Sequence, residues 1–166
     1  MSDADNVFVT MVHAWSEFVL RQVGRVRDVG RESARLSRQL DREWDRDLDE
    51  VARGVWRQRW TEEHALVWAA YQLDQWARRL AKERGEEMPE EDVLLRNARN
   101  AVEHLDEALF DEEHIAEPGD VLKKNRSLRD LPGGRLTIAT GGKLFDNLEL
   151  GELETFARRH LDRIER

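Results

Sequence analysis

The residues best suited to chemistry in this sequence gather in one short stretch, LLRNARNAVEHLDEALFDEEH, from Leu94 to His114. Nine residues of it contain two arginines, two asparagines and a histidine: Arg96, Asn97, Arg99, Asn100 and His104. An imidazole titrates near neutral pH and can act as a general acid or base. A guanidinium can bind phosphate or stabilise a developing negative charge. This stretch is therefore the first candidate for a functional site.

Helical geometry sorts these residues into faces. At 100° per residue, Asn97, Asn100 and His104 lie along one margin of an apolar stripe that we expect to be core. A half-shielded margin of this kind suits either a partly dry pocket or a partner helix. Arg99 falls roughly 140° from His104, whereas Arg96 lies only about 80° away, so geometry alone favours Arg96 as the phosphate ligand. The expected core stripe is Leu94, Ala98, Ala101, Leu105 and Leu109.

The segment Arg99-Asn-Ala-Val-Glu-His104 reads R-N-x-x-x-H. It resembles the R-x4–6-H motif of the HEPN superfamily, in which a polar residue, often Asn, follows the arginine. HEPN domains are small helical bundles that commonly dimerise, and many are metal-independent ribonucleases of toxin–antitoxin, abortive-infection and CRISPR systems. A second R-x4-H, from Arg59 to His64, is expected to straddle the start of a helix and is set aside.

The resemblance implies a role for each residue of the motif. His104 is the expected acid–base residue, Arg99 stabilises the phosphate, and Asn100 orients the imidazole or the phosphate. Arg96 and Asn97 are the expected substrate-binding neighbours. The implied substrate is RNA, with no metal and no cofactor. Because Arg99 and His104 point apart on one helix, we expect a homodimer in which each chain completes the other's site.

Two broader interpretations follow for the function. One is an HEPN-like ribonuclease that acts as a toxin, abortive-infection or phage-defence effector, with an antitoxin or another defence-system protein as partner. The alternative is a non-catalytic helical interaction protein, in which the margin with Asn97, Asn100 and His104 binds a partner.

Other kinds of site find little support in the sequence. A metal centre in a helical bundle would use Glu-x-x-His on two helices, and the nearest pattern is Asp111-x-x-His114. The chain has no cysteine, so it has neither disulfides nor a thiol nucleophile. Arginines that recur at steps of three and four form a cationic stripe that either tracks an RNA backbone or pairs with nearby carboxylates. They are Arg27, Arg31, Arg35, Arg38 and Arg42.

Composition limits the class of protein. The chain has 166 residues, 40% of them hydrophobic and 37% charged, which predicts a single globular domain, residues 1–166. The net charge of −8 counts against non-specific coating of nucleic acid. The acidic N-terminus lacks the pattern of a signal peptide, and no apolar run is long enough to span a membrane. We therefore expect a cytoplasmic protein with no membrane partner.

Apolar periodicity predicts a mainly α fold, a bundle of four to five helices with a small C-terminal β-hairpin and a final short helix. Two helices are expected before residue 58, divided at Gly30, unless one long bent helix forms. Thr61 is the expected start of the next helix, and Pro89 of the one that reaches about Phe110. Residues 1–112 would form the HEPN-like core, and residues 113–166 the loop, the hairpin (135–140 with 143–145) and a last helix over 150–164. Most of the six tryptophans are expected in the core or at a dimer interface.

Overall fold

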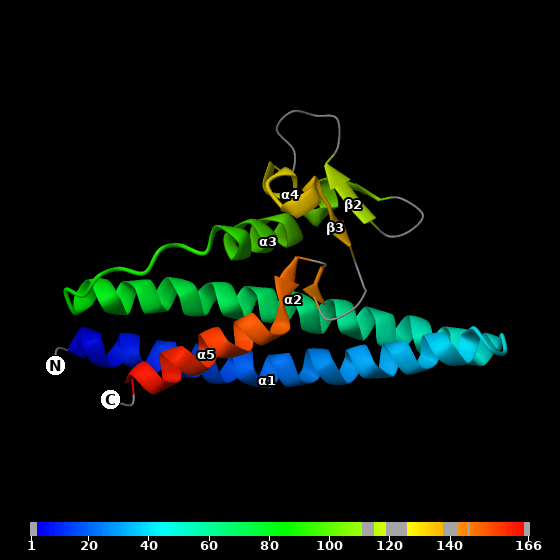
Figure 1. Ribbon diagram of the computed structural model, residues 1–166, viewed down its shortest axis with the longest axis horizontal. Helices are drawn as coiled ribbons and strands as arrows, with labels where there is room; N and C mark the ends of the chain where they lie inside the picture. The colour runs from blue at the N-terminus through cyan, green and yellow to red at the C-terminus, as the bar shows by residue number, and fades with distance from the viewer. Residues whose placement is uncertain (1–2, 111–114, 119–125, 138–142, 146, 165–166) are drawn as a thin grey trace.

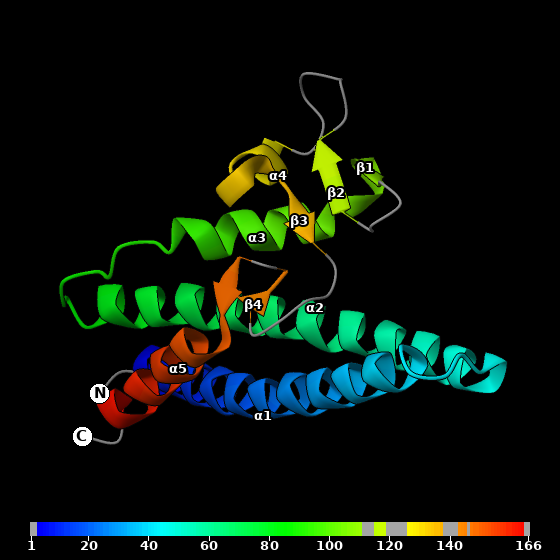
Figure 2. The same cartoon turned by 45° about the vertical axis from the view of Figure 1, so that its right-hand side comes forward.

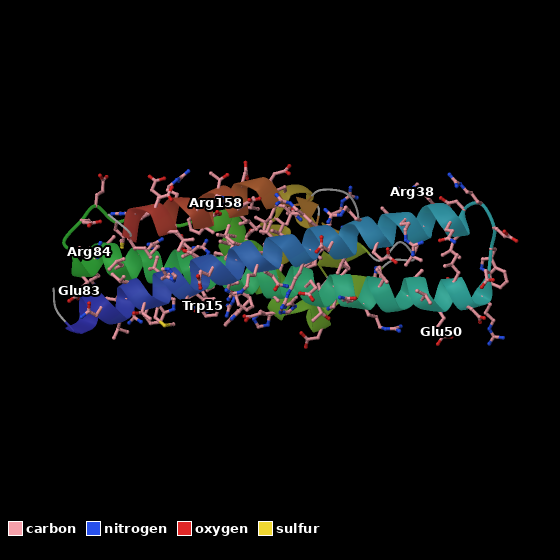
Figure 3. All side chains as sticks on the ribbon, turned by 90° about the horizontal axis from the view of Figure 1, so that it is seen from below. Trp15, Arg38, Glu50, Glu83, Arg84 and Arg158 are labelled. Atoms are coloured by element: carbon pink, nitrogen blue, oxygen red, sulfur yellow. The ribbon has the colours of Figure 1, made fainter. Side chains whose placement is uncertain are left out.

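Two long antiparallel helices dominate the computed structural model, which describes residues 3–110, 115–118, 126–137, 143–145 and 147–164. Helix α1 (Asp3–Leu40) and helix α2 (Arg46–Glu83) lie side by side over their whole length, as Figures 1 and 3 show. Helix α3 (Val93–Glu103) lies against α2, and helix α5 (Leu150–Ile164) packs mainly on α1 (Figure 2). The predicted mainly helical fold with a last short helix near the C-terminus is confirmed.

The packing of α1 on α2 follows a heptad-like spacing. Buried residues of α2 recur at alternating steps of four and three from Arg59 to Leu80, and those of α1 do so from Val12 to Val26. This period keeps one seam of each helix facing the other along a coiled-coil-like pair. The seam residues are Val12, Ser16, Val19, Val23 and Val26 in α1, and Arg59, Glu63, Leu66, Ala70, Leu73, Ala77 and Leu80 in α2.

The break between the first two helices is not at Gly30, and that prediction was wrong. Helix α1 runs through Gly30 without interruption and ends at Leu40. The next helix begins after Asp45, whose Oδ1 accepts hydrogen bonds from the backbone N–H groups of Asp47 (2.8 Å) and Leu48 (3.0 Å). A glycine inside a helix costs only about 1 kcal/mol, less than the apolar contacts that bury the seam on either side of it.

The expected helix starts at Thr61 and Pro89 were also wrong. Thr61 lies inside α2, where its hydroxyl donates to the Arg57 carbonyl at 3.1 Å instead of capping a helix. Helix α3 begins after Asp92, whose Oδ1 accepts from the Leu95 N–H at 2.9 Å. The side-chain caps come instead from Asp45, well before Thr61, and from Asp92, just after Pro89.

Helix α3 ends earlier than predicted. It stops at Glu103 and is followed by a short 3-10 turn, η1 (Leu105–Glu107), and strand β1 (Ala108–Phe110). The predicted helix end near Phe110 was therefore wrong, and Leu109, which was expected in the core, is 59% exposed. Leu95 and Val102 are buried in its place, so the core face of α3 is rotated relative to the predicted stripe.

A small antiparallel sheet caps α3 on the side away from α2 (Figure 1). Its order is β1, β2 (Ile115–Pro118), β3 (Leu136–Thr137), with Leu109 opposite Glu117 and Ala116 opposite Leu136. A four-residue helix, α4 (Arg126–Arg129), and a 3-10 turn, η2 (Pro132–Gly134), precede β3. The sheet begins at Ala108, before the boundary expected near residue 112.

A hairpin does precede α5, but its strands differ from those predicted. Strand β4 (Lys143–Leu144) pairs with β5 (Leu148–Glu149), while β3, expected to pair with residues 143–145, pairs with β2. Residues 138–142, which include the predicted Gly-Gly turn, lie outside the described residues. A two-stranded hairpin is marginal by itself, and here tertiary packing selects which segments pair.

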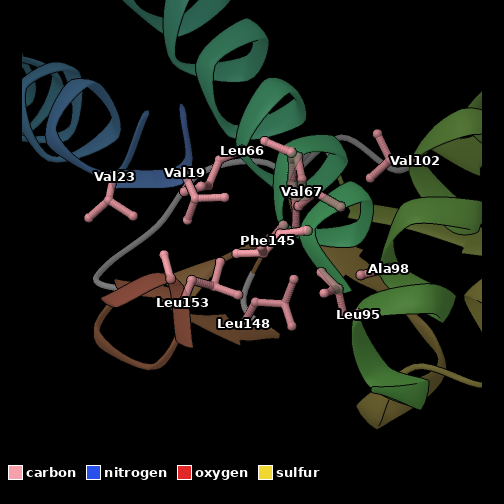
Figure 4. Close-up of a cluster of buried hydrophobic side chains, with 14 of the residues drawn as sticks. Val19, Val23, Leu66, Val67, Leu95, Ala98, Val102, Phe145, Leu148 and Leu153 are labelled. Atoms are coloured by element: carbon pink, nitrogen blue, oxygen red, sulfur yellow. The ribbon is translucent and has the colours of Figure 1, made fainter. Parts of the chain in front are cut away.

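One hydrophobic cluster joins the helices to this hairpin. Phe145, at the turn of the hairpin, is 1% exposed and packs among residues of α1, α2, α3 and α5, as Figure 4 shows. Its φ of 50° is unusual for a residue with a side chain, and burial of the ring compensates for that backbone conformation. The Trp60 ring lies 5.3 Å from the Phe145 ring and holds the hairpin against α2.

The end of the α1–α2 pair that carries their connection extends past the other elements (Figures 1 and 2). From residue 37 to residue 58 no side chain is buried. Trp44 is 72% exposed and Val51 is 53% exposed. We call this segment, residues 37–58, the free end of the hairpin of α1 and α2.

Candidate functional site

The residues that resemble the HEPN motif lie on and just after α3, between α2 and the small sheet. The buried face of α3 consists of Leu95, Asn97, Ala98, Ala101 and Val102. This buried face fixes the rotation of α3, so the side chains of Arg99, Asn100 and Glu103 lie beside α2 or at the margin of the buried face.

Arg99 is the most constrained of the motif residues. Its guanidinium carbon lies 5.0 Å from the centre of the Trp68 ring and 5.1 Å from that of Tyr71, both on α2. Its Nη2 lies 2.7 Å from Glu103 Oε2, and its Nη1 donates to Asn100 Oδ1 at 2.8 Å. Two cation–π contacts and one ion pair hold the side chain back against α2.

One nitrogen of Arg99 is left without a partner. Its Nε is buried and makes no hydrogen bond, although the side chain as a whole keeps 24% of its surface exposed. A buried donor without an acceptor is costly, and such groups often mark a site that a ligand completes.

Asn100 acts on the arginine rather than on the imidazole. Its side-chain oxygen accepts from Arg99, and its backbone carbonyl accepts from the His104 N–H at 3.2 Å. Asn100 is half-buried. Asn100 was expected to orient the imidazole or the phosphate, and its described side-chain contact is instead with the guanidinium of Arg99.

His104 directly follows α3. It is the C-cap residue, with φ −109° and ψ 27°, and it is exposed. The ring is accessible from solvent at the same end of α3 as Glu103.

The two expected substrate-binding residues behave differently. Arg96 is 38% exposed and forms an ion pair with Glu91, so it points toward the start of α3. Asn97 is only 7% exposed, inside the packing between helices, and we leave it out of the site. Geometry had favoured Arg96 over Arg99, and the described contacts place Arg99 nearer the end that carries His104.

The structure adds a histidine that the sequence reasoning had set aside. His64 lies on α2, half-buried, with its ring 6.1 Å from the Trp60 ring. Burial lowers the pKa of His64, and the nearby carboxylate of Glu103 opposes that shift. Because Glu103 also pairs with Arg99, one carboxylate on α3 faces both an imidazole and a guanidinium. The expectation that Arg59 to His64 straddles a helix start was wrong, since α2 is continuous there.

Arg59 and Glu63 form a structural ion pair beneath the hairpin. Arg59 Nε donates to Glu63 Oε1 at 2.6 Å, with side chains 10% and 2% exposed. Burial raises the pKa of Glu63, and hydrogen bonds from Arg59 and from the Phe145 backbone oppose that shift. The pair satisfies two buried charges and joins α2 to the hairpin.

Three of the five arginines in the predicted stripe form ion pairs, and Arg42 lies after the end of α1. Arg27 pairs with Glu154 of α5 at 2.7 Å, Arg35 pairs with Glu32 at 2.7 Å, and Arg31 pairs with Asp28. The expected pairing with nearby carboxylates is therefore confirmed for Asp28 and Glu32. The described contacts favour a structural role for these arginines over one in tracking RNA.

In the described part of the chain, no group of three or more His, Asp or Glu side chains is placed to hold a metal ion. In the same residues, none of the helices combines the length and the apolar character needed to cross a bilayer.

Comparisons of the chain with protein-family models, with curated proteins and with solved structures found no match. The HEPN resemblance rests on the six residues from Arg99 to His104 and on the helical surroundings.

Proposed function

We propose that this chain is a metal-independent ribonuclease of the HEPN kind, acting in the cytoplasm as a toxin, abortive-infection or phage-defence effector. The observation that supports it best is the state of Arg99. Its guanidinium is held by two aromatic rings and oriented by Asn100, at the same end of α3 as the exposed imidazole of His104. A fixed cation and an accessible acid–base group are two of the components that phosphodiester cleavage without metal requires.

The proposed reaction is attack of a ribose 2′-oxygen on the adjacent phosphorus. The new bond is 2′-O–P, the broken bond is P–5′-O, and one imidazole removes the 2′ proton while another protonates the leaving oxygen. Arg99 stabilises the negative charge on phosphorus, and Asn100 keeps the guanidinium in place. Because Arg99 and His104 diverge within one chain, the proposal includes a homodimer that supplies both imidazoles to one phosphodiester.

Single alanine variants test the proposal in an RNA-cleavage assay on the purified chain. We expect His104→Ala and Arg99→Ala each to lower the cleavage rate by about 100-fold or more, the usual contribution of a general acid–base or charge-stabilising residue. Arg96→Ala should leave the rate within about threefold of the original, a change of less than 1 kcal/mol in the barrier. Overexpression should slow growth with the original chain and not with His104→Ala.

His13→Ala is the matched control, because His13 is an accessible histidine on α1, far along the chain from the motif. Its cleavage rate should equal that of the original chain. Cleavage that survives His104→Ala would end the ribonuclease proposal.

A second candidate function has its own supporting observation, the uncovered free end of the hairpin. Two large apolar side chains, Trp44 and Val51, are exposed there, and a hollow of about 630 Å³ lies between α1 and α2 beside Trp56. Exposed apolar surface of this kind often marks an interaction site. The second candidate is therefore a helical interaction protein that associates through residues 37–58.

A further inference from the structure

An aromatic hollow on α2 lies beside Arg99 and has no part in the reaction described above. It has a volume of about 390 Å³ and opens to solvent. Its aromatic lining consists of Trp60, His64 and Trp68, which recur every fourth residue on one face of α2. Thr61 and Ala65, both small, leave space between the three rings.

One edge of the hollow is cationic. Trp68 belongs both to the hollow and to the pair of rings on which the Arg99 guanidinium rests. The guanidinium therefore reaches α2 at the end of the hollow formed by Trp68. The other end is formed by Trp60, which is fixed against Phe145.

The carboxylate of Glu103 is the partner of the Arg99 guanidinium when no ligand is bound. This carboxylate lies 2.7 Å from Arg99 Nη2 and also acts on His64. Without a ligand, Glu103 satisfies Arg99 in part, but the buried Nε of Arg99 stays without an acceptor. An anion with several oxygens could bind both Nη2 and Nε in a forked arrangement, which one carboxylate oxygen at 2.7 Å does not provide.

Aromatic rings next to a guanidinium suit a nucleotide. All nucleobases can stack on Trp and His side chains, and the phosphate of a nucleotide binds arginine. We propose that this hollow binds one nucleotide, with its base against Trp60, His64 and Trp68 and its phosphate on Arg99 in place of Glu103. The inference deepens the proposed ribonuclease function, on which its biological meaning rests, because the nucleotide would be part of the RNA substrate.

The full-length chain can be tested with the four ribonucleoside monophosphates, with the matching nucleosides and with inorganic phosphate, by NMR titration of the histidine and indole resonances. We expect the monophosphates to shift the signals of His64, Trp60 and Trp68. Nucleosides and phosphate alone should each bind at least about tenfold more weakly, since each makes only one of the two contacts.

Two variants separate binding from mere packing. His64→Ala should weaken nucleotide binding by about fivefold or more, the effect of losing one ring from the stack. Glu103→Gln should strengthen it by about threefold or more, because it removes a negative charge that competes for Arg99. A purely structural role for Arg99 and Trp68 predicts no such gain. His13→Ala and Trp44→Ala, at sites away from the hollow, should change nothing.

The outcomes are distinct for this inference and for the ribonuclease proposal. Absence of shifts at millimolar nucleotide, shifts unchanged by His64→Ala, or nucleosides that bind as well as nucleotides would overturn the subsite. Nucleotide binding that behaves as expected, in a chain that cleaves no RNA, would retain the subsite and reject the ribonuclease. Cleavage without nucleotide binding in the hollow would do the reverse.

Discussion

His160 on α5 is a buried histidine with no part in the proposed site. It is 7% exposed, and its ring lies 4.7 Å from that of Phe156 in an edge-to-face arrangement. Burial, with the guanidiniums of Arg163 and Arg159, lowers the pKa of His160 to about 4. The folded chain therefore favours the neutral imidazole of His160, and protonation of this ring favours the unfolded chain.

This residue predicts a loss of stability in acid. Between pH 6.5, the pKa of an unperturbed histidine, and about pH 4, the unfolded chain binds a proton at His160 that the folded chain does not. Its contribution to the free energy of unfolding is therefore complete above pH 6.5 and decreases as the pH falls to about 4, by up to about 3 kcal/mol.

Urea unfolding followed by tryptophan fluorescence can measure this effect at about pH 7.5 and about pH 4.5. The decrease in unfolding free energy should be smaller for His160→Leu than for the original chain. The comparison between variants is essential, because Glu63 and Asp74 have pKa values raised by burial and contribute in the opposite direction. Equal decreases in both proteins would contradict the prediction.

At the scale of elements, burial rather than local propensity decides where helices begin and end. Helix α1 continues through Gly30 because Val26, Val29 and Leu36 are buried on both sides of it. Helix α2 ends where Gly85 adopts a φ of 64°, a left-handed conformation that favours glycine. Gly30 therefore lies inside a helix, whereas Gly85 ends one.

Alanine substitutions distinguish these two roles. Gly30→Ala should raise the free energy of unfolding by about 0.5–1 kcal/mol, because an added methyl group meets nothing within 4 Å and the helix propensity improves. Gly85→Ala should lower it by about 1 kcal/mol, because alanine is strained at positive φ. Thermal and urea unfolding measure both. A destabilised Gly30→Ala would show that α1 needs a flexible point there.

At the scale of the whole molecule, the hydrophobic core covers one part of the α1–α2 pair and does not reach the free end. The cluster that joins α1, α2, α3 and α5 includes Val12 to Val26 of α1 and Leu66 to Leu80 of α2. Residues 37–58 lack such cover, and they carry acidic and basic side chains in nearly equal measure. A segment with both signs of charge and exposed apolar side chains can pair with the same segment of a second copy of the chain.

We therefore expect the chain to associate through its free end. Light scattering should show a mass that rises with concentration toward twice 19.5 kDa. Trp44→Ser with Val51→Ser should keep the protein monomeric without lowering its unfolding temperature, because both side chains are exposed. Identical masses for the original and the double variant would rule out this surface. If the variant is monomeric yet cleaves RNA normally, the reaction needs no dimer and the homodimer in the proposed mechanism is rejected.

How much could be predicted from the sequence differs from element to element. The mainly helical fold and the range of α5 followed from apolar periodicity alone, since one buried face per helix leaves a 3.6-residue pattern whatever the partner is. The helix starts at Asp45 and Asp92 carried a readable signal, an aspartate two or three residues before the first turn's N–H groups. Thr61 and Pro89 offered competing signals of similar strength, and local patterns could not rank them.

Some residues of the candidate site could be identified from the sequence, and others could not. Arg99, Asn100 and His104 were proposed because they resemble a short sequence motif, which a sequence contains in full. His64, Trp68 and Tyr71 were not, because their approach to Arg99 and Glu103 depends on how α2 and α3 pack. The burial of Asn97 likewise depends on the rotation of α3 about its own axis.

The sequence by itself determined the mainly helical fold, the range of α5 and the presence of a guanidinium and an imidazole five residues apart. Only the tertiary structure decided which strands pair, where the first hairpin turns and which aromatic rings hold Arg99. The physical reason is that periodicity and caps act between residues near in the chain, whereas strand pairing and cation–π contacts act between residues brought together by burial of a shared core.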